Sequence, residues 1–252
     1  MTDPTTENTA PGVPMAGPLY KDVKRQMMEA LSRGEWPPGD AIPAERRLSE
    51  RYRISIGTVR KAIDELVAEN ILIRQQGRGT FVASHNRDRM LFYFFHVVPQ
   101  DGPKEYPEVG FLSFSRGKAE RVAADALGMP VGDPVFRIRN LLRLSGRPAI
   151  VDDLTLPAAR FGGLTEKQFR ARPSTIYNLY QEAFGISVVR TRERLRAAVA
   201  DADVARLLDI APGAPLLAIR RVALAYNDIP VEYRVSLVDT GHFEYWNEIR
   251  GF

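Results

Sequence analysis

The sequence contains no cysteine, and this absence excludes several classes of site at once. Without thiols, the 252-residue chain can form no disulfide framework, no thiolate metal site and no cysteine nucleophile. It also has no apolar run long enough to cross a bilayer, and its N-terminus lacks the pattern of a signal peptide. Residues 1–17, rich in Pro and Thr, are predicted to be a disordered tail. We therefore expect a cytoplasmic protein with no membrane partner.

Patterns of catalytic and metal-binding residues are missing as well. The three histidines, His85, His96 and His242, lie far apart, so no pair has the spacing of metal ligands. The sequence has no phosphate-binding glycine loop, no dinucleotide fingerprint and no nucleophile elbow. It therefore predicts no enzyme, no cofactor and no metal site. The net charge of +4 is compatible with binding nucleic acid but is too small to indicate it alone.

What the sequence does contain is a pair of helices joined by a sharp turn, at Ala44–Leu66. The second helix is predicted to begin at Ser55, whose hydroxyl can cap it. Its apolar residues share one face, and its polar residues share the other. The first set is Val59, Ala62, Ile63 and Leu66, and the second is Gly57, Arg60, Lys61 and Asp64. This is the build of a recognition helix in a helix-turn-helix. The alternative is a surface helix with a solvated face.

A small β-hairpin is predicted directly after this helix, at Ile71–Ala83. Alternating residues lead to the turn Gly77-Arg78-Gly79, and Thr80-Phe81-Val82 returns. Together with a helix predicted at Leu19–Arg33, the hairpin completes a winged helix. The recognition helix would then enter the major groove of DNA, while an arginine at the wing tip suits the negative potential of the minor groove.

The same stretch resembles the GntR family of bacterial transcription regulators. The resemblance rests on the ordered motifs Leu-Tyr, Pro-Ala-Glu-Arg-Arg-Leu, Thr-Val-Arg-Lys-Ala and Gln-Gly-Arg-Gly-Thr-Phe-Val. It implies contacts with DNA from the first helix of the pair, the start and interior of the recognition helix, and the wing. The predicted DNA-binding residues are Arg46, Ser55, Thr58, Arg60, Lys61, Gln76, Gly77, Arg78 and Thr80. One departure is Ile56, which stands where the family often has arginine.

The winged-helix domain is predicted to span residues 18–85, and a linker is predicted at residues 86–90. Residues 91–252 are predicted to form a second domain. Leu91–Val98 is expected to be a buried strand, and Phe111–Phe114 a short one. An internal repeat follows, in which Leu127 and Leu208, for example, lie 81 positions apart. Each copy reads as a short helix, a turn and a hairpin of two strands. The two hairpins should pair into one antiparallel sheet with helices on one side, which gives an α+β fold.

The first hairpin carries a row of arginines. Strand periodicity places Arg137, Arg139 and Arg143 on one face, opposite an apolar face. An anionic ligand would satisfy them, because guanidinium groups bind carboxylates and phosphates with paired hydrogen bonds. Asp152 and Glu232, on the returning strands, are expected to face the same cavity. The alternative, a solvated strand face paired with local acids such as Asp152 and Asp153, stays open.

This second domain resembles the effector-binding UTRA domain of the HutC-type branch of GntR regulators, which is similar in fold to chorismate lyase. The resemblance implies an effector site formed by Arg137, Arg139, Asp152, Thr175 and Glu232. It implies a homodimer that binds a two-fold symmetric DNA operator, most often as a repressor. A small anionic metabolite would release this homodimer from the operator. Localisation would be cytoplasmic and nucleoid-associated. A lyase-like enzyme and a DNA-binding architectural protein with a merely structural second domain are the alternatives.

Overall fold

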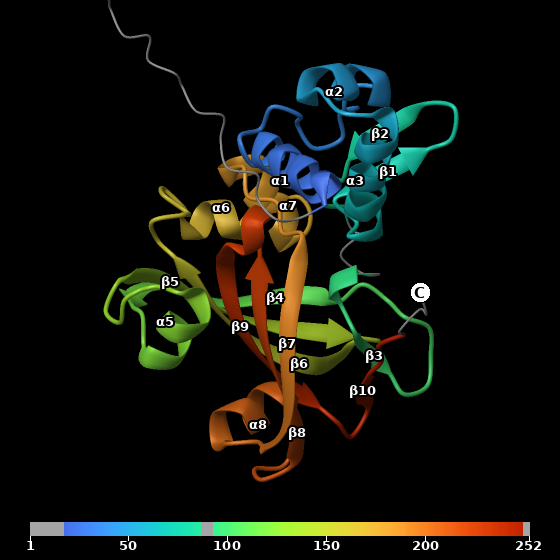
Figure 1. Ribbon diagram of the computed structural model, residues 1–252. Coiled ribbons are helices and arrows are strands. Elements are labelled where there is room, and N and C mark those ends of the chain that lie inside the picture. Colours follow the sequence, from blue (N-terminus) through green and yellow to red (C-terminus); the bar gives the residue numbers. More distant parts are fainter. Residues whose placement is uncertain (1–17, 87–92, 249–252) are drawn as a thin grey trace, which may run out of the picture.

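The computed structural model describes residues 18–86 and 93–248, which form two domains with the smaller one seated on one end of the larger (Figure 1). The predicted tail, residues 1–17, and the predicted linker apart from Asn86 lie outside these ranges. Among the described helices, none is long and apolar enough to cross a bilayer.

The N-terminal domain is the predicted winged helix. Its elements are helices α1 (Leu19–Ser32), α2 (Glu45–Tyr52) and α3 (Ile56–Ala68) and strands β1 (Leu72–Gln75) and β2 (Gly79–Val82). The three helices share one buried apolar cluster, to which α3 contributes the predicted residues, Val59, Ala62, Ile63 and Leu66. Because these four occupy a single face, the opposite face of α3 stays on the surface.

Two left-handed residues set the path of the chain around α3. Arg53, with a φ of 54°, ends α2, and Ser55 then caps α3. At the other end Asn70, with a φ of 57°, turns the chain into the wing. The asparagine side chain is among the few that tolerate this conformation.

The C-terminal domain is built on one antiparallel sheet with the strand order β4-β5-β6-β9-β8-β7. The strands are β4 (Glu108–Lys118), β5 (Pro134–Leu144), β6 (Arg147–Pro157), β7 (Arg190–Val199), β8 (Pro215–Leu224) and β9 (Pro230–Asp239). The predicted repeat is confirmed, because α5 (Arg121–Leu127) precedes the β5–β6 hairpin as α8 (Ala202–Leu208) precedes the β8–β9 hairpin. The hairpins join through β6 and β9, and each unit adds an edge strand, β4 or β7.

The prediction of helices on one side of the sheet is wrong, because helices cover both faces. Helix α5 packs near Tyr233 and α8 near Val151 on one face. Helices α6 (Glu166–Arg170) and α7 (Ile176–Phe184) lie on the other face, over Leu154. The central strands β6 and β9 are buried at consecutive positions, which is the pattern of strands covered on both sides.

Two strand predictions near the start of this domain also need correction. The strand expected at Leu91–Val98 is limited to β3 (Val97–Pro99), which pairs with β10 (Phe243–Tyr245) in a separate two-stranded sheet. Residues 91 and 92 lie outside the described ranges, and Phe94 is buried without belonging to a strand. The short strand expected at Phe111–Phe114 is the middle of the longer β4.

The domains meet where the turn between β8 and β9 reaches the helices of the winged helix. Tyr226 lies in this turn, η2 (Tyr226–Asp228), and only 7% of it is exposed. It belongs to the same buried cluster as Met27 and Leu31 of α1, and Val189 packs against that cluster. A side chain of the C-terminal domain therefore completes the core of the N-terminal one.

Candidate DNA-binding surface and effector cavity

The start of α3 presents polar groups that suit a phosphate or a base edge. The Ser55 hydroxyl accepts a hydrogen bond from the Thr58 backbone N–H at 3.1 Å, and the two hydroxyls lie 2.8 Å apart. The helix dipole adds positive potential at this end. Ile56 is 42% exposed here, so an apolar surface stands beside these hydroxyls. It can contact a thymine methyl but cannot donate a hydrogen bond.

Arg60 and Arg46 are both exposed, and each is held by a carboxylate of α2. The Arg60 guanidinium lies 2.8 Å from a Glu45 oxygen, and this hydrogen bond raises the pKa of Arg60. Arg74 of the wing lies 3.7 Å from the same carboxylate. Arg46 lies 3.3 Å from Glu50. The exposed pairs orient these guanidinium groups at the surface, where solvent and a phosphate can compete for them.

The wing places three of the predicted DNA contacts, Gln76, Gly77 and Arg78, at its exposed tip. Gly77 and Gly79 take positive φ values of 71° and 123°, and Arg78 stands between them with its guanidinium 5.8 Å from the Phe81 ring centre. Thr80 is half-buried, and its carbonyl accepts a hydrogen bond from Ile42 N–H. Elsewhere on α3, the Lys61 ammonium lies 4.3 Å from the Tyr20 ring centre, so it points back toward α1.

The five predicted effector residues do not line one cavity. Arg139 pairs with Asp153 and Asp203 at 2.9 and 2.8 Å, and Arg137 pairs with Glu120, all on the face covered by α5 and α8. Asp152 lies on the opposite face. The cause is a β-bulge between Leu142 and Arg143, which pairs Arg139 with Asp153 instead of Asp152. A one-residue register shift moves a side chain to the other face of a sheet.

Asp152 and Glu232 share the α7 face with Arg234, a residue that the sequence analysis did not identify as part of the site. Arg234, 93% buried, lies 3.0 Å from Glu232 and 3.1 Å from Asp152. Tyr180 donates to Glu232 at 2.7 Å, and Ser236 donates to Asp152. Burial, reinforced by the Glu232 charge, raises the pKa of Tyr180 well above its ordinary value. It therefore remains a donor to Glu232, and Arg234, Tyr180 and Ser236 together stabilise the two buried acids.

A small, partly open cavity of about 40 Å³ lies beside this network. Its polar walls are Asn140, Asp152, Arg172 and Arg234, and Ile176 at the start of α7 closes one side. Asn140 is only 4% exposed, and its side-chain oxygen has no hydrogen-bond partner among the described residues. Desolvation lowers the pKa of Arg172, whose side chain donates to the Phe169 carbonyl. Burying an unpaired acceptor is costly, so a donor from a bound molecule would be stabilising here.

Helix α7 connects this cavity to the start of the interdomain linker. Thr175, the remaining predicted effector residue, caps α7 by accepting from Asn178 N–H at 3.0 Å. On the next turns the Asn178 side-chain amide donates to the His85 backbone carbonyl at 3.1 Å, and the side-chain Oε1 of Gln181 accepts from His85 N–H at 2.8 Å. Helix α7 thus binds both the backbone N–H and the backbone carbonyl of His85, which lies at the end of the winged-helix domain.

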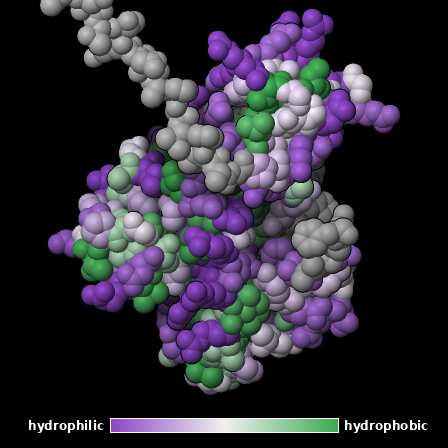
Figure 2. All heavy atoms as spheres, viewed as in Figure 1, coloured by the Kyte–Doolittle hydropathy of each residue, from purple (hydrophilic) through white to green (hydrophobic). Residues whose placement is uncertain are grey.

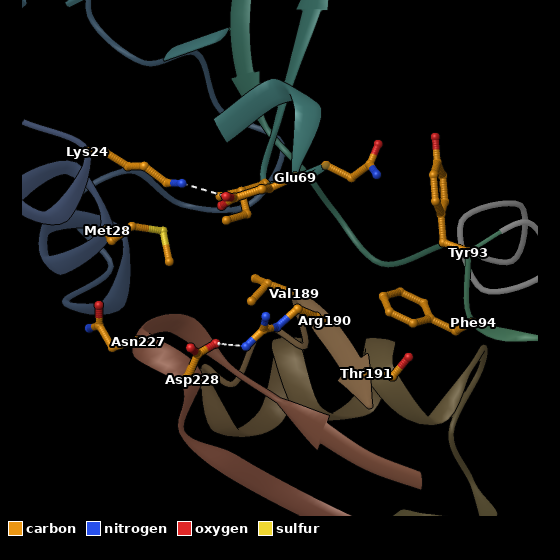
Figure 3. A pocket seen from close by; sticks show the side chains of 12 residues that line it. Lys24, Met28, Glu69, Tyr93, Phe94, Val189, Arg190, Thr191, Asn227 and Asp228 are labelled. Atoms are coloured by element: carbon orange, nitrogen blue, oxygen red, sulfur yellow. Dashed lines mark hydrogen bonds and ion pairs between the residues drawn. The ribbon is translucent and has the colours of Figure 1, made fainter. Parts of the chain in front are cut away.

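Three further hollows are larger, and two of them exceed 500 Å³. One of about 510 Å³ lies on the α5 face and is lined by Arg137, Arg139 and Asp153. The other, of about 540 Å³, lies between the domains, with Met28 of α1 on one side and Asn227 and Asp228 of the η2 turn on the other (Figure 3). Nowhere in residues 18–86 and 93–248 do three or more His, Asp or Glu side chains cluster as metal ligands would.

Comparison with known proteins connects the two halves to described families. Residues 19–82 match the family described as "Bacterial regulatory proteins, gntR family", and residues 105–244 match the UTRA domain. The chain is 31% identical to "Probable fructoselysine utilization operon transcriptional repressor" of Escherichia coli (strain K12), over 84% of this chain and 87% of that protein. It is 30% identical to the "Histidine utilization repressor" of Pseudomonas putida, over 81% of each chain. The ligand-binding domain of a GntR-family transcriptional regulator from Bordetella bronchiseptica is 35% identical, with a TM-score of 0.60, over 63% of this chain and 99% of that one.

Proposed function

The chain belongs to the GntR family of bacterial regulatory proteins and carries a UTRA domain, and on that premise we propose that it is a repressor that a small metabolite releases from DNA. It is a ligand-responsive transcription regulator rather than an enzyme, as the relatives that cover most of its length are named repressors. The winged helix reads the operator through α3 and the wing. The UTRA domain senses the metabolite.

The effector site is the cavity beside Asp152, and the unpartnered oxygen of Asn140 is the observation that carries this assignment. The hollow at Arg137 and Arg139 is larger, but carboxylates already compensate both guanidinium groups. This small cavity has room for little more than a few water molecules. A metabolite can therefore bind only if some of the lining residues move. Because Ile176 of α7 is one of these residues, binding would shift α7.

Movement of α7 reaches the DNA-binding domain through its two hydrogen bonds to His85. A shift of this helix changes where the winged helix is anchored, and operator affinity falls by the coupling free energy, typically about 1–3 kcal/mol. The chain acts as a homodimer in the cytoplasm, associated with the nucleoid through its operator. A two-fold protein matches a two-fold DNA site, so an effector can change the separation of the two recognition helices.

Replacing Arg60 with Ala is expected to weaken specific operator binding by about ten- to a hundred-fold, if its guanidinium pairs with a guanine edge. The measurement is a gel-shift titration with the DNA upstream of the chain's own gene. Arg121→Ala, on α5, removes the same charge far along the chain and serves as the control. An unchanged operator affinity in the Arg60 variant would show that the docking of α3 is wrong.

The effector site can be assigned with a thermal-shift screen of small anionic metabolites. A metabolite present at a hundred times its Kd should stabilise the folded chain by about 2.7 kcal/mol. This stabilisation should be lost in Asn140→Leu and Arg172→Gln but kept in the double variant Arg137→Gln/Arg139→Gln. The reverse pattern would place the site on the α5 face, and stabilisation by no metabolite would argue for the architectural alternative.

A further inference from the structure

The edge strand β7 carries a row of arginines on one open face. Strand alternation places Arg192, Arg194 and Arg196 on the same side, and Arg220 of β8 pairs with Arg194 across the strands. All four are exposed. Hydrophilic side chains gather over the part of the surface that β7 crosses (Figure 2). Successive guanidinium groups along β7 originate roughly 6.7 Å apart, the rise of two strand residues.

These four arginines differ from their neighbours because they have no acid beside them. Arg190, at the start of the same strand, pairs with Asp228 at 2.5 Å, and Arg206 of α8 pairs with Asp203 at 2.7 Å. Across residues 18–86 and 93–248, no carboxylate forms an ion pair with Arg192, Arg194, Arg196 or Arg220. The patch is therefore a local excess of positive charge, which attracts anionic partners and repels cationic ones.

The other face of β7 is unusual for an edge strand in that it exposes apolar side chains. Leu195 is 44% exposed and Val199 is 71% exposed. The one acid on this face, Glu193, turns inward to a buried ion pair with Arg221. The outer edge of β7 pairs with no strand among the described residues. Guanidinium groups, apolar side chains and backbone hydrogen-bonding groups are thus all available along one strand.

We propose that β7 docks an extended acidic segment of another protein, which adds as a seventh strand beside it. In such a strand, Asp or Glu at every second position would face the arginine row. The intervening apolar residues would cover Leu195 and Val199, and the backbones would pair. The partner is therefore a segment in which acidic and apolar residues alternate.

Other occupants fit this edge less well. Two copies of β7 pairing antiparallel around a two-fold axis at Leu195 would set Arg194 against Arg196 of the second copy, and like charges directly opposite are destabilising. Single-stranded nucleic acid binds largely by stacking on aromatic rings, and neither β7 nor β8 contains one. A charged edge that served only to prevent aggregation would not also expose Leu195 and Val199.

The test is a binding titration of the full chain at low salt with a short synthetic peptide in which glutamate alternates with valine and threonine. Binding should weaken by about ten-fold or more in the triple variant Arg192→Gln/Arg194→Gln/Arg196→Gln, because three cross-strand charge pairs are lost. The matched control is Arg121→Gln/Arg147→Gln/Arg160→Gln, which removes the same charge from exposed positions elsewhere. This control variant should bind the peptide as the unaltered chain does.

Two further probes separate strand addition from simple attraction. A peptide N-methylated at alternate residues keeps its charges but cannot complete the backbone pairing, so it should bind at least about ten-fold more weakly. Equal binding of the two peptides would overturn strand addition. Tighter binding of a single-stranded oligonucleotide, lost in the β7 triple variant, would assign the row to nucleic acid and overturn the proposal. Equal peptide binding by both triple variants would also overturn it.

Discussion

Replacing Arg234 with Ala is expected to lower the free energy of unfolding of the C-terminal domain by about 3–5 kcal/mol. Arg234 is the only described cation within ion-pair distance of Glu232 and Asp152, which are 0% and 2% exposed. Without it, both acids remain buried next to each other's charge, and hydrogen bonds from Tyr180 and Ser236 compensate them only in part. Urea denaturation followed by circular dichroism measures the loss.

The matched control is Arg206→Ala, which breaks an exposed pair with Asp203 and should change stability little. A second variant distinguishes lost charge compensation from lost packing. Combining Arg234→Met with Glu232→Gln and Asp152→Asn removes all three charges together and should recover much of the stability, since a buried ionic group can be replaced by neutral side chains of similar size. A loss as large in the triple variant as in Arg234→Ala would contradict this account.

The DNA-binding half could be predicted closely because its information is local. The burial of Val59, Ala62, Ile63 and Leu66 follows from helical period alone, and Ser55 caps α3 because a hydroxyl at that position satisfies a free N–H. The glycines at 77 and 79 fix the wing turn, since both need positive φ. What the sequence could not give is how Arg60 is held, because Glu45 is fifteen positions away.

The sheet of the second domain could be predicted from its repeat, but the face of each effector candidate could not. An unbroken hairpin from the Ser145-Gly146 turn would pair Arg139 with Asp152, and both would face one cavity. The bulge at Leu142 and Arg143 shifts the register by one residue and sends Asp152 to the α7 face. Pro148, which lies beside the bulge in this central strand, is a local signal of an irregular position, but it does not reveal which residues pair beyond the bulge. Asn140 and Arg172 were missed for the same reason, since they become site candidates only once Asp152 is placed beside them.

The contact between the domains also lay beyond the sequence, because it joins an aromatic residue of one hairpin turn to a core more than a hundred residues earlier. In the sequence, Tyr226 directly precedes the turn residues Asn227 and Asp228, and this local pattern does not indicate burial in another domain. Both of these neighbours have positive φ, and the turn they form directs the Tyr226 ring into the winged helix. The hairpin that carries Glu232 and Arg234 therefore also carries the anchor of the DNA-binding domain.

Replacing Tyr226 with Ala is expected to destabilise the winged helix by about 3–5 kcal/mol while leaving the C-terminal domain nearly unchanged. The lost ring is buried against α1, so its removal exposes apolar surface of the N-terminal core around Met27 and Leu31. The chain has only two tryptophans, and they report the domains separately. Trp36 is buried in the winged-helix cluster, and Trp246 follows β10 in the C-terminal domain.

The measurement uses two backgrounds, Trp246→Phe to follow Trp36 and Trp36→Phe to follow Trp246, each with and without Tyr226→Ala. Only the denaturation midpoint reported by Trp36 should fall. Tyr226→Phe, which keeps the ring, should restore the part of this loss that comes from packing of the ring against α1. Equal shifts of both midpoints would mean that the domains unfold as one cooperative unit. An unchanged Trp36 midpoint would mean that the winged helix is stable without this anchor, and α7 with His85 would then be the main connection between effector cavity and DNA.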